Sequence, residues 1–389
     1  MLTCAPDRSL VHLIYSGLFM TYAKITGWGK CVPPAVLTND DLSKFVDTSD
    51  EWILSRTGIQ ERRITHVELS ELATLAAKRA LAAAGLEGSD LDLIILATAS
   101  GDSLIPNTAS AVQRNIGACN AAAFDQNAAC SGFLYGLQMG TAMIKSGVNR
   151  RVLVIGADRL NYYINWADRA SAVLFGDGAG AVILEASDDA CGLLAAKLGC
   201  DPERRDILEV QGPGTYVDRF HTSACYNIAF EGPEIFKRAI NGMNSACQTA
   251  LSDAGMSGSD IDVIIPHQAN LRIIQTLAKK MGVGMEKVMV NIHKYGNTSA
   301  ASVAIALCEA VEEGRIQAGS NILSAAFGAG LTYAGVVIKW GDRVTPIRTI
   351  DDELPPCDKS ASELVSSAVE GCLQATAEGT VNFARSPKL

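Results

Sequence analysis

The sequence lacks the features of a membrane protein or a nucleic-acid-binding protein. No run of about 20 apolar residues occurs, which is the length that a membrane-spanning helix needs; the apolar stretch at residues 10–19 is short, and His12 interrupts it. Positive charge is not in excess, because the formal net charge is −9, and non-specific nucleic-acid binding needs a basic surface. We therefore expect partners other than nucleic acid or membrane.

The cysteines also lack the close spacing of a metal site. The chain has 11 of them, and no CxxC or CxxxC pair is present, so no metal ligands are predicted. Scattered thiols in a chain of 389 residues are typical of a reducing compartment, where most cysteines are small buried hydrophobic residues. We expect a cytoplasmic protein that needs no metal or other cofactor.

The composition is that of a globular protein large enough for two domains or two related halves, with 48% apolar and 19% charged residues. Residues 1–19 resemble neither a spanning helix nor a cleaved signal peptide. Since Met20 follows them, we interpret them as an extension upstream of a possible second start.

An internal duplication is the most informative feature. The sequence AGLEGSDLDLII at 84–95 returns as AGMSGSDIDVII at 254–265, each position 170 residues further on. Each copy follows a helical stretch (72–83 and 246–253) and ends in an apolar run typical of a strand buried on both faces. Gly85 and Gly255 have the place of helix C-caps.

The correspondence continues beyond this segment. Each half is predicted to have a strand, a small-residue turn and a long helix, at 122–129 and 131–145, then at 288–295 and 299–313. Further matching strands are predicted at 152–158 and 179–185 in the first half and at 321–327 and 334–340 in the second. The pattern predicts two pseudo-symmetric α/β halves, residues 20–190 and 191–342. Residues 343–389 lack it, and we expect a C-terminal appendage, partly mobile, with one amphipathic helix at 360–377.

Three chemically suited residues follow strands of these halves. Cys130 lies in AACSGF, between a strand and a helix, where amide groups and the helix dipole are expected to lower the pKa of the thiol. Small neighbours allow a sharp turn and close approach of a substrate carbonyl. An arbitrary cysteine is more often a buried structural residue, but this position favours a nucleophile.

His267, in PHQAN, ends the second-half strand, and Asn297, in YGNTSAAS, precedes a helix. Individually they are readily explained as a core histidine and an ordinary N-cap. Since ligands favour the carboxyl ends of strands, we expect the two residues to meet Cys130 there. A cysteine, a histidine and an asparagine also serve papain-like hydrolases, where the asparagine orients the histidine. The duplicated architecture argues against that alternative.

The segments DTSDEWILSRTGIQERR at 47–63, AACSGF, FGDGAGA at 175–181, PHQANLRI, YGNTSAAS and AFGAGLTYAG at 326–335 resemble β-ketoacyl-acyl-carrier-protein synthase III, of the thiolase superfamily. The resemblance covers about residues 20–342. It implies a duplicated thiolase-like fold with layers in the order αβαβα.

The resemblance implies that Cys130 takes an acyl group from acyl-CoA, and that malonyl-acyl-carrier protein then loses carbon dioxide and attacks the thioester. His267 and Asn297 would stabilise the enolate. The backbone N–H groups of Cys130 and Ala329 would form the oxyanion hole, although many relatives have glycine at the latter position.

The resemblance also implies a CoA site and a homodimer. An adenine would stack on Trp52 and Arg169, with Arg56 near phosphate and Asn270 on pantetheine. Ile105 would reach across the dimer to the floor of the acyl pocket. Docking of the acidic acyl-carrier protein is predicted at Lys237, Arg238, Arg272, Lys279 and Lys280, although solvated helix faces explain these charges equally well.

Three alternatives remain open. A condensing enzyme of secondary metabolism would share the same three residues. Thiolases and mitochondrial-type elongating synthases usually have a second cysteine or histidine where Asn297 lies, so they fit this sequence less well. A non-catalytic partner subunit would typically lack Cys130.

Overall fold

The computed structural model describes residues 21–211 and 225–381 and contains two main β-sheets. The first has the strand order β1-β7-β6-β4-β5 and the second β11-β12-β13-β8. The strands of the first are β1 (Tyr22–Cys31), β4 (Leu93–Ala97), β5 (Ala122–Gln126), β6 (Arg151–Arg159) and β7 (Asp177–Ser187). Those of the second are β8 (Gly192–Cys200), β11 (Val263–Pro266), β12 (Asn321–Gly328) and β13 (Thr332–Lys339).

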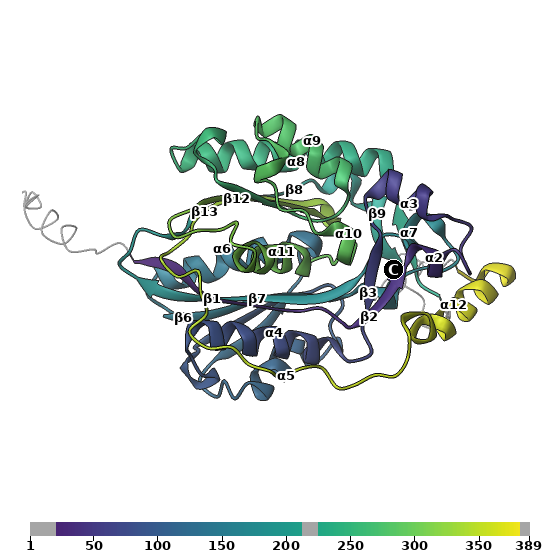
Figure 1. Cartoon of the computed structure of the whole chain (residues 1–389), viewed down its shortest axis with the longest axis horizontal. Coiled ribbons are helices and arrows are strands. Elements are labelled where there is room, and N and C mark those ends of the chain that lie inside the picture. The colour runs from purple at the N-terminus through teal and green to yellow at the C-terminus, as the bar shows by residue number, and fades with distance from the viewer. Residues whose placement is uncertain (1–20, 212–224, 382–389) are drawn as a thin grey trace, which may run out of the picture.

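Helices form three layers around these sheets (Figure 1). The helices α4 (Leu69–Ala84) and α5 (Thr108–Asn115) cover the first sheet, and α8 (Gly232–Asp253) and α9 (Leu271–Met281) cover the second. Between the sheets lie α6 (Gly132–Lys145) and α11 (Ala301–Glu312). Because α11 meets protein on all sides, its residues from 301 to 311 are all buried. The predicted αβαβα order is confirmed.

The duplication is visible element by element. Strand β6 begins 170 residues before β12, and β1 begins 170 residues before β8. Gly85 ends α4 with φ of 73°, and Gly255 follows α8 with φ of 66°, so both have the left-handed conformation that glycine adopts without strain. The strand predicted at 288–295 was wrong: Val288 makes an isolated bridge to Ile264, and α10 (Ile292–Tyr295) follows.

Short elements gather at one end of the two sheets (Figure 1). They are β2 (Ala35–Thr38), α2 (Asn39–Leu42), α3 (Asp50–Thr57), β3 (Glu61–Ile64), α7 (Arg169–Ala172), β9 (Leu208–Gln211) and β10 (Asn227–Phe230). The strands β9 and β10 form an antiparallel ribbon of their own. This end of the molecule contains the cavity described below.

The C-terminal segment, which was predicted to be an appendage to the two halves, packs on the body of the protein. The backbone N–H groups of Ile347 and Arg348 donate to carbonyls near the end of α4, and α12 (Ala361–Glu378) then reaches the cavity end of the molecule. Ser360 caps α12, where the amphipathic helix was predicted. The apolar face of α12 joins the cluster that contains Trp166.

A disulfide joins Cys225, next to β10, to Cys372 on α12. This contradicts, for these two residues, the expectation of reduced thiols. The pair is 147 residues apart in the sequence, so spacing could not reveal it. No helix in the described part of the chain has the length and apolar character to cross a membrane. Residues 1–19 lie outside the described ranges.

Candidate active site

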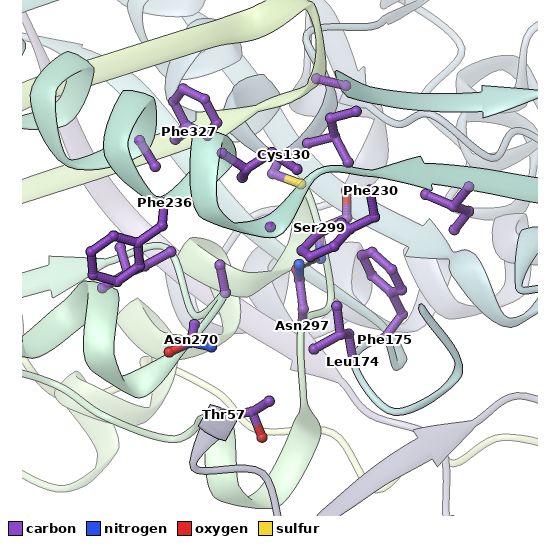
Figure 2. A pocket seen from close by; sticks show the side chains of 18 of the residues that line it. Thr57, Cys130, Leu174, Phe175, Phe230, Phe236, Asn270, Asn297, Ser299 and Phe327 are labelled. Atoms are coloured by element: carbon purple, nitrogen blue, oxygen red, sulfur yellow. Dashed lines mark hydrogen bonds between the residues drawn. The ribbon is translucent and has the colours of Figure 1, made fainter. Parts of the chain in front are cut away.

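A cavity of about 610 Å³ opens at the end of the sheets where the short elements gather. The β9–β10 ribbon forms one wall with Leu208, Val210 and Phe230, and α8 and β12 contribute Phe236 and Phe327. Most of its lining is apolar, and Figure 2 shows aromatic side chains around the sulfur of Cys130. Such a lining suits an apolar chain and a thioester arm.

Cys130, His267 and Asn297 all line this cavity, although they come from three separate parts of the chain. Figure 2 shows Cys130 and Asn297 facing the same space. The convergence predicted from the duplication is therefore present in the structure.

Cys130 lies in a single 3-10 turn, η2 (Ala129–Ser131), directly before α6. Burial raises the pKa of its thiol to about 12, although a hydrogen bond with Ser299 works in the opposite direction. The expected lowering by the helix start was wrong for the unliganded chain, because desolvation outweighs it. Cys130 is therefore a neutral thiol at rest.

His267 follows β11 and has only 3% of its surface exposed. Its Nδ1 atom lies 2.5 Å from the hydroxyl oxygen of Ser302, and its backbone N–H donates to the carbonyl of Ala325 at 2.7 Å. Burial lowers the pKa of the imidazole to about 3, so the ring is neutral near pH 7. With Nδ1 engaged by Ser302, Nε2 is the ring nitrogen left for a ligand.

Asn297 is held by both its backbone and its side chain. Its N–H donates to the carbonyl of Leu174 at 2.8 Å, and its Oδ1 accepts from the N–H of Ser299 at 2.9 Å. Since Oδ1 is used within the protein, Nδ2 is the group that can donate to a ligand. A neutral imidazole and a carboxamide together can hold one developing oxyanion.

Ala329 lines the cavity from the turn η7 (Ala329–Leu331). Its neighbour Gly328 lies against the nucleophile: a Cβ added there would be 2.6 Å from the backbone nitrogen of Cys130. Close approach therefore requires glycine at this position. The predicted oxyanion-hole residues Cys130 and Ala329 are thus neighbours at the cavity.

Two guanidinium groups lie close to the ring of Trp52 at the mouth. The Cζ atom of Arg56 is 4.5 Å from the centre of the indole ring, and that of Arg169 is 4.6 Å away. Asn270 caps α9 and donates from Nδ2 to the carbonyl of Arg56 at 3.0 Å. Trp52, Arg56 and Asn270 line the cavity, and Arg169 borders it through the ring of Trp52.

The predicted docking residues are not equivalent. Arg272 is exposed and lines the cavity, whereas Lys279 and Lys280 are exposed at the far end of α9. Lys237 is exposed on α8. Arg238 forms ion pairs with Asp201 and Glu234, so its charge is already neutralised within the chain.

Ile105 lies outside the cavity. It is 85% exposed, and its neighbour Leu104 is 91% exposed. Two large apolar side chains exposed to this degree are unusual on the surface of a single chain.

Sequence reasoning missed Asp158, Ser299 and Ser302, which are buried around the three candidate residues. Asp158 accepts from the N–H of Ala300 at 3.0 Å, and burial raises the pKa of its carboxyl. The 170-residue repeat carried a signal for two of them, because it aligns Asp158 with Gly328 and Ser299 with Ala129. In the described ranges, no group of three or more His, Cys, Asp and Glu side chains could hold a metal ion.

Comparisons with known proteins identify the family of the chain. Two family models match, the 3-oxoacyl-[acyl-carrier-protein] synthase III model at residues 124–202 and the C-terminal model of the same enzyme at 251–340. Beta-ketoacyl-[acyl-carrier-protein] synthase III 2 of Vibrio vulnificus strain YJ016 is 62% identical over 90% of this chain and 97% of its own length. Its counterpart from Vibrio cholerae is 56% identical over the same shares.

Solved structures show the same likeness. The synthase III from Aquifex aeolicus has a TM-score of 0.78 and 46% identity over 82% of this chain and 100% of that one. The priming β-ketosynthase of the R1128 polyketide pathway has a TM-score of 0.78 and 34% identity over 82% of this chain and 97% of that one. The chain belongs to the β-ketoacyl-acyl-carrier-protein synthase III family.

Proposed function

We propose that this protein transfers an acyl group from acyl-CoA to Cys130 and condenses it with malonyl-acyl-carrier protein, which initiates fatty-acid synthesis. The observation that carries the proposal is the meeting of a thiol, a neutral imidazole and an oriented carboxamide in one largely apolar cavity. The family supports the proposal, since its relatives are named as synthases of a β-ketoacyl-[acyl-carrier-protein], which is the product of this condensation.

In the first half-reaction the sulfur of Cys130 attacks the acyl-CoA carbonyl. The backbone N–H groups of Cys130 and Ala329 stabilise the tetrahedral oxyanion, and the carbon–sulfur bond to CoA breaks. The thiol proton of Cys130 leaves with the CoA thiolate, so acyl-Cys130 and CoA-SH are the products. Because Cys130 rests as a thiol, loss of this proton is part of the barrier.

In the second half-reaction malonyl-acyl-carrier protein loses carbon dioxide, and its thioester carbonyl becomes an enolate oxygen. Nε2 of His267 and Nδ2 of Asn297 donate hydrogen bonds to that oxygen, each worth about 10²–10³ in rate. A neutral imidazole donates only if Nε2 carries the proton, which requires Nδ1 to accept from the Ser302 hydroxyl. The enolate carbon attacks acyl-Cys130, and the departing sulfur takes up a proton.

We place the enzyme in the cytoplasm as a homodimer that binds acyl-CoA and acyl-carrier protein and needs no cofactor. The exposed Leu104 and Ile105 support an interface between copies, with Ile105 at the acyl pocket of the neighbouring copy. Substitution Ile105→Asp is expected to produce monomers in analytical ultracentrifugation. Ile105→Phe is expected to shorten the longest acyl-CoA accepted, whereas an unchanged chain-length series would remove Ile105 from the pocket.

The central test uses intact-mass trapping with a panel of acyl-CoAs, followed by malonyl-acyl-carrier protein with mass detection of products. Wild type is expected to gain one acyl group and Cys130→Ala none. His267→Ala is expected to keep acylation and lose decarboxylation. Normal acylation of Cys130→Ala would refute the nucleophile assignment.

A priming role in secondary metabolism is the second candidate. The R1128 polyketide synthase shares the fold at 34% identity. Product analysis distinguishes the two, because a polyketide enzyme delivers its β-ketoacyl product to a carrier protein of a polyketide pathway.

A further inference from the structure

The nucleophile turn occurs twice in this structure, once in each half. In the first half Asn127 Oδ1 accepts from the N–H of Ala129 at 3.0 Å; in the second, Asn297 Oδ1 accepts from the N–H of Ser299 at 2.9 Å. Ala129 has φ of 47° and Ser299 φ of 50°, and these are the only non-glycine residues with positive φ in the described ranges. Asn127 and Asn297 are 170 positions apart in the sequence, and so are Ala129 and Ser299. The strained turn itself is therefore duplicated.

The residue after each strained position is Cys130 in the first half and Ala300 in the second. The groups that face their N–H groups differ in kind. Gly328 lies beside the nitrogen of Cys130 and leaves room only because it lacks a Cβ. Asp158, which is 170 positions before Gly328, accepts from the N–H of Ala300 at 3.0 Å. The space beside the N–H of Cys130 can therefore accept a ligand oxygen, whereas the corresponding space beside the N–H of Ala300 is filled by the carboxyl group of Asp158.

The carboxylate of Asp158 is itself held rigidly. Its Oδ1 accepts from the hydroxyl groups of Thr98 and Ser100, at 3.0 and 2.7 Å, and from the N–H of Ala99 at 2.8 Å. Asp158 has no exposed surface, and Ser299 forms a further hydrogen bond with it. Oδ1 therefore accepts hydrogen bonds from the residues that follow β4, and Oδ2 accepts one from the turn that leads into α11.

We propose that the carboxyl group of Asp158 occupies the second half's copy of the oxyanion hole, and that it positions Asn297 for the condensation step. The link has two steps: Asp158 Oδ2 fixes the N–H of Ala300, and the adjacent N–H of Ser299 fixes the Oδ1 of Asn297. Figure 2 shows Ser299 between Cys130 and Asn297 at the cavity wall.

This inference rests on the proposed roles of Cys130 and Asn297. It predicts an effect on one half-reaction only, because Asn297 acts on the malonyl enolate and not on acyl transfer from CoA. An amide in place of the carboxylate cannot both accept from Ala300 and keep all the contacts on Oδ1. The turn would then hold Asn297 less well, and the cost would appear when the enolate forms.

The test measures two rates in Asp158→Asn: acylation of Cys130 by intact mass, and carbon dioxide release from malonyl-acyl-carrier protein by pre-acylated enzyme. Acylation is expected to stay within about 3-fold of wild type, while decarboxylation falls about 30-fold or more. When Asp158→Asn is combined with Asn297→Ala, it is expected to lower the decarboxylation rate less than about 3-fold further. The reason is that both substitutions remove the same function, the hydrogen bond from Asn297 to the enolate.

Ser100→Ala is the matched control, since it removes a donor to Oδ1 and leaves the Ala300 contact; it should change decarboxylation less than about 3-fold. If Asp158→Asn does not fold, Ser299→Gly is compared with Ser299→Ala instead, because both lose the hydroxyl that contacts Cys130 and only glycine adopts this φ without strain and loosens the turn; decarboxylation should be about 5-fold lower in Ser299→Gly than in Ser299→Ala, and acylation equal in the two. An equal loss in both rates, a loss of acylation alone, or full additivity with Asn297→Ala would each overturn the inference. Failure of the wild type to decarboxylate malonyl-acyl-carrier protein would instead refute the proposed function.

Discussion

The hydroxyl oxygen of Ser302 lies 2.5 Å from Nδ1 of His267, and both groups are buried. Ser302 is in α11, the helix between the sheets, whereas His267 follows a strand of the second sheet. This contact fixes the plane of the imidazole ring and selects the nitrogen that faces the cavity.

The first prediction concerns Ser302→Ala. Without the hydroxyl the ring keeps its packing but loses the partner that selects its tautomer, at a cost of about 1–1.5 kcal/mol, or about 10-fold in rate. Decarboxylation of malonyl-acyl-carrier protein should fall by that factor, and acylation of Cys130 should not change. The measurement is single-turnover kinetics of each step, and a larger loss in acylation would contradict the assignment.

The second prediction concerns the pH dependence of the nucleophile. Burial raises the pKa of Cys130 to about 12, so the thiolate fraction should rise about tenfold for each pH unit between pH 6 and 9. Alkylation of Cys130 by iodoacetamide, followed by peptide mass mapping, should rise accordingly without a plateau. Alkylation of the exposed Cys119, measured in the same digest, is the internal reference for the rate at Cys130. A plateau between pH 6 and 8 would show that the thiol is ionised at rest.

The third prediction concerns His267 as a titrating group. The folded pKa is about 3 and the usual value is 6.5, so between these values the unfolded chain binds a proton that the folded chain does not. Titration of His267 therefore does not affect the free energy of unfolding above pH 6.5, and it lowers that free energy as the pH falls from 6.5 towards 3. Unfolding by urea at pH 7.5 and 5 should show this loss in wild type and a smaller one in His267→Gln. Equal losses would contradict the lowered pKa.

The repeat explains which parts of the site could be predicted from the sequence. Because the halves align without gaps around the active site, the strand ends that carry His267 and the turn that carries Asn297 could be located from their counterparts. The β9–β10 ribbon was not predicted, since its strands are only four residues long; β2–β3 is its counterpart in the first half, between β1 and α4 as β9–β10 lies between β8 and α8. The pKa of Cys130 was predicted in the wrong direction because the helix start is visible in a sequence, whereas the desolvation of a folded cavity is not.

The fourth prediction concerns Trp52. Stacking of a base on an aromatic ring contributes about 1–3 kcal/mol, so Trp52→Ala should raise the KM for acyl-CoA about 5- to 150-fold with little change in the maximal acylation rate. An acyl-pantetheine thioester lacks the adenine and serves as the matched substrate, whose KM should not change. Arg169→Ala should have the same selectivity, because its guanidinium covers the same ring. An equal effect on both substrates would place the adenine elsewhere.

The fifth prediction separates Arg272 from the other positive charges on α9. Arg272 lies at the cavity, and Lys280 is eight positions further along the helix, about 12 Å away. If an acidic carrier protein docks at the mouth, Arg272→Glu should weaken turnover with malonyl-acyl-carrier protein at least about 10-fold at low ionic strength, and the difference should shrink as salt is added.

Lys280→Glu makes the same change of charge on the same helix and is the control for this fifth prediction. At physiological ionic strength its effect should be several-fold smaller than that of Arg272→Glu, because its distance from the mouth exceeds the Debye length of about 8 Å under that condition. Loading of Cys130 from acyl-CoA is measured in parallel, since Arg272 also lines the cavity. If Arg272→Glu slowed loading as much as carrier-dependent turnover, or if the two variants behaved alike, the charge at Arg272 would not be a docking contact.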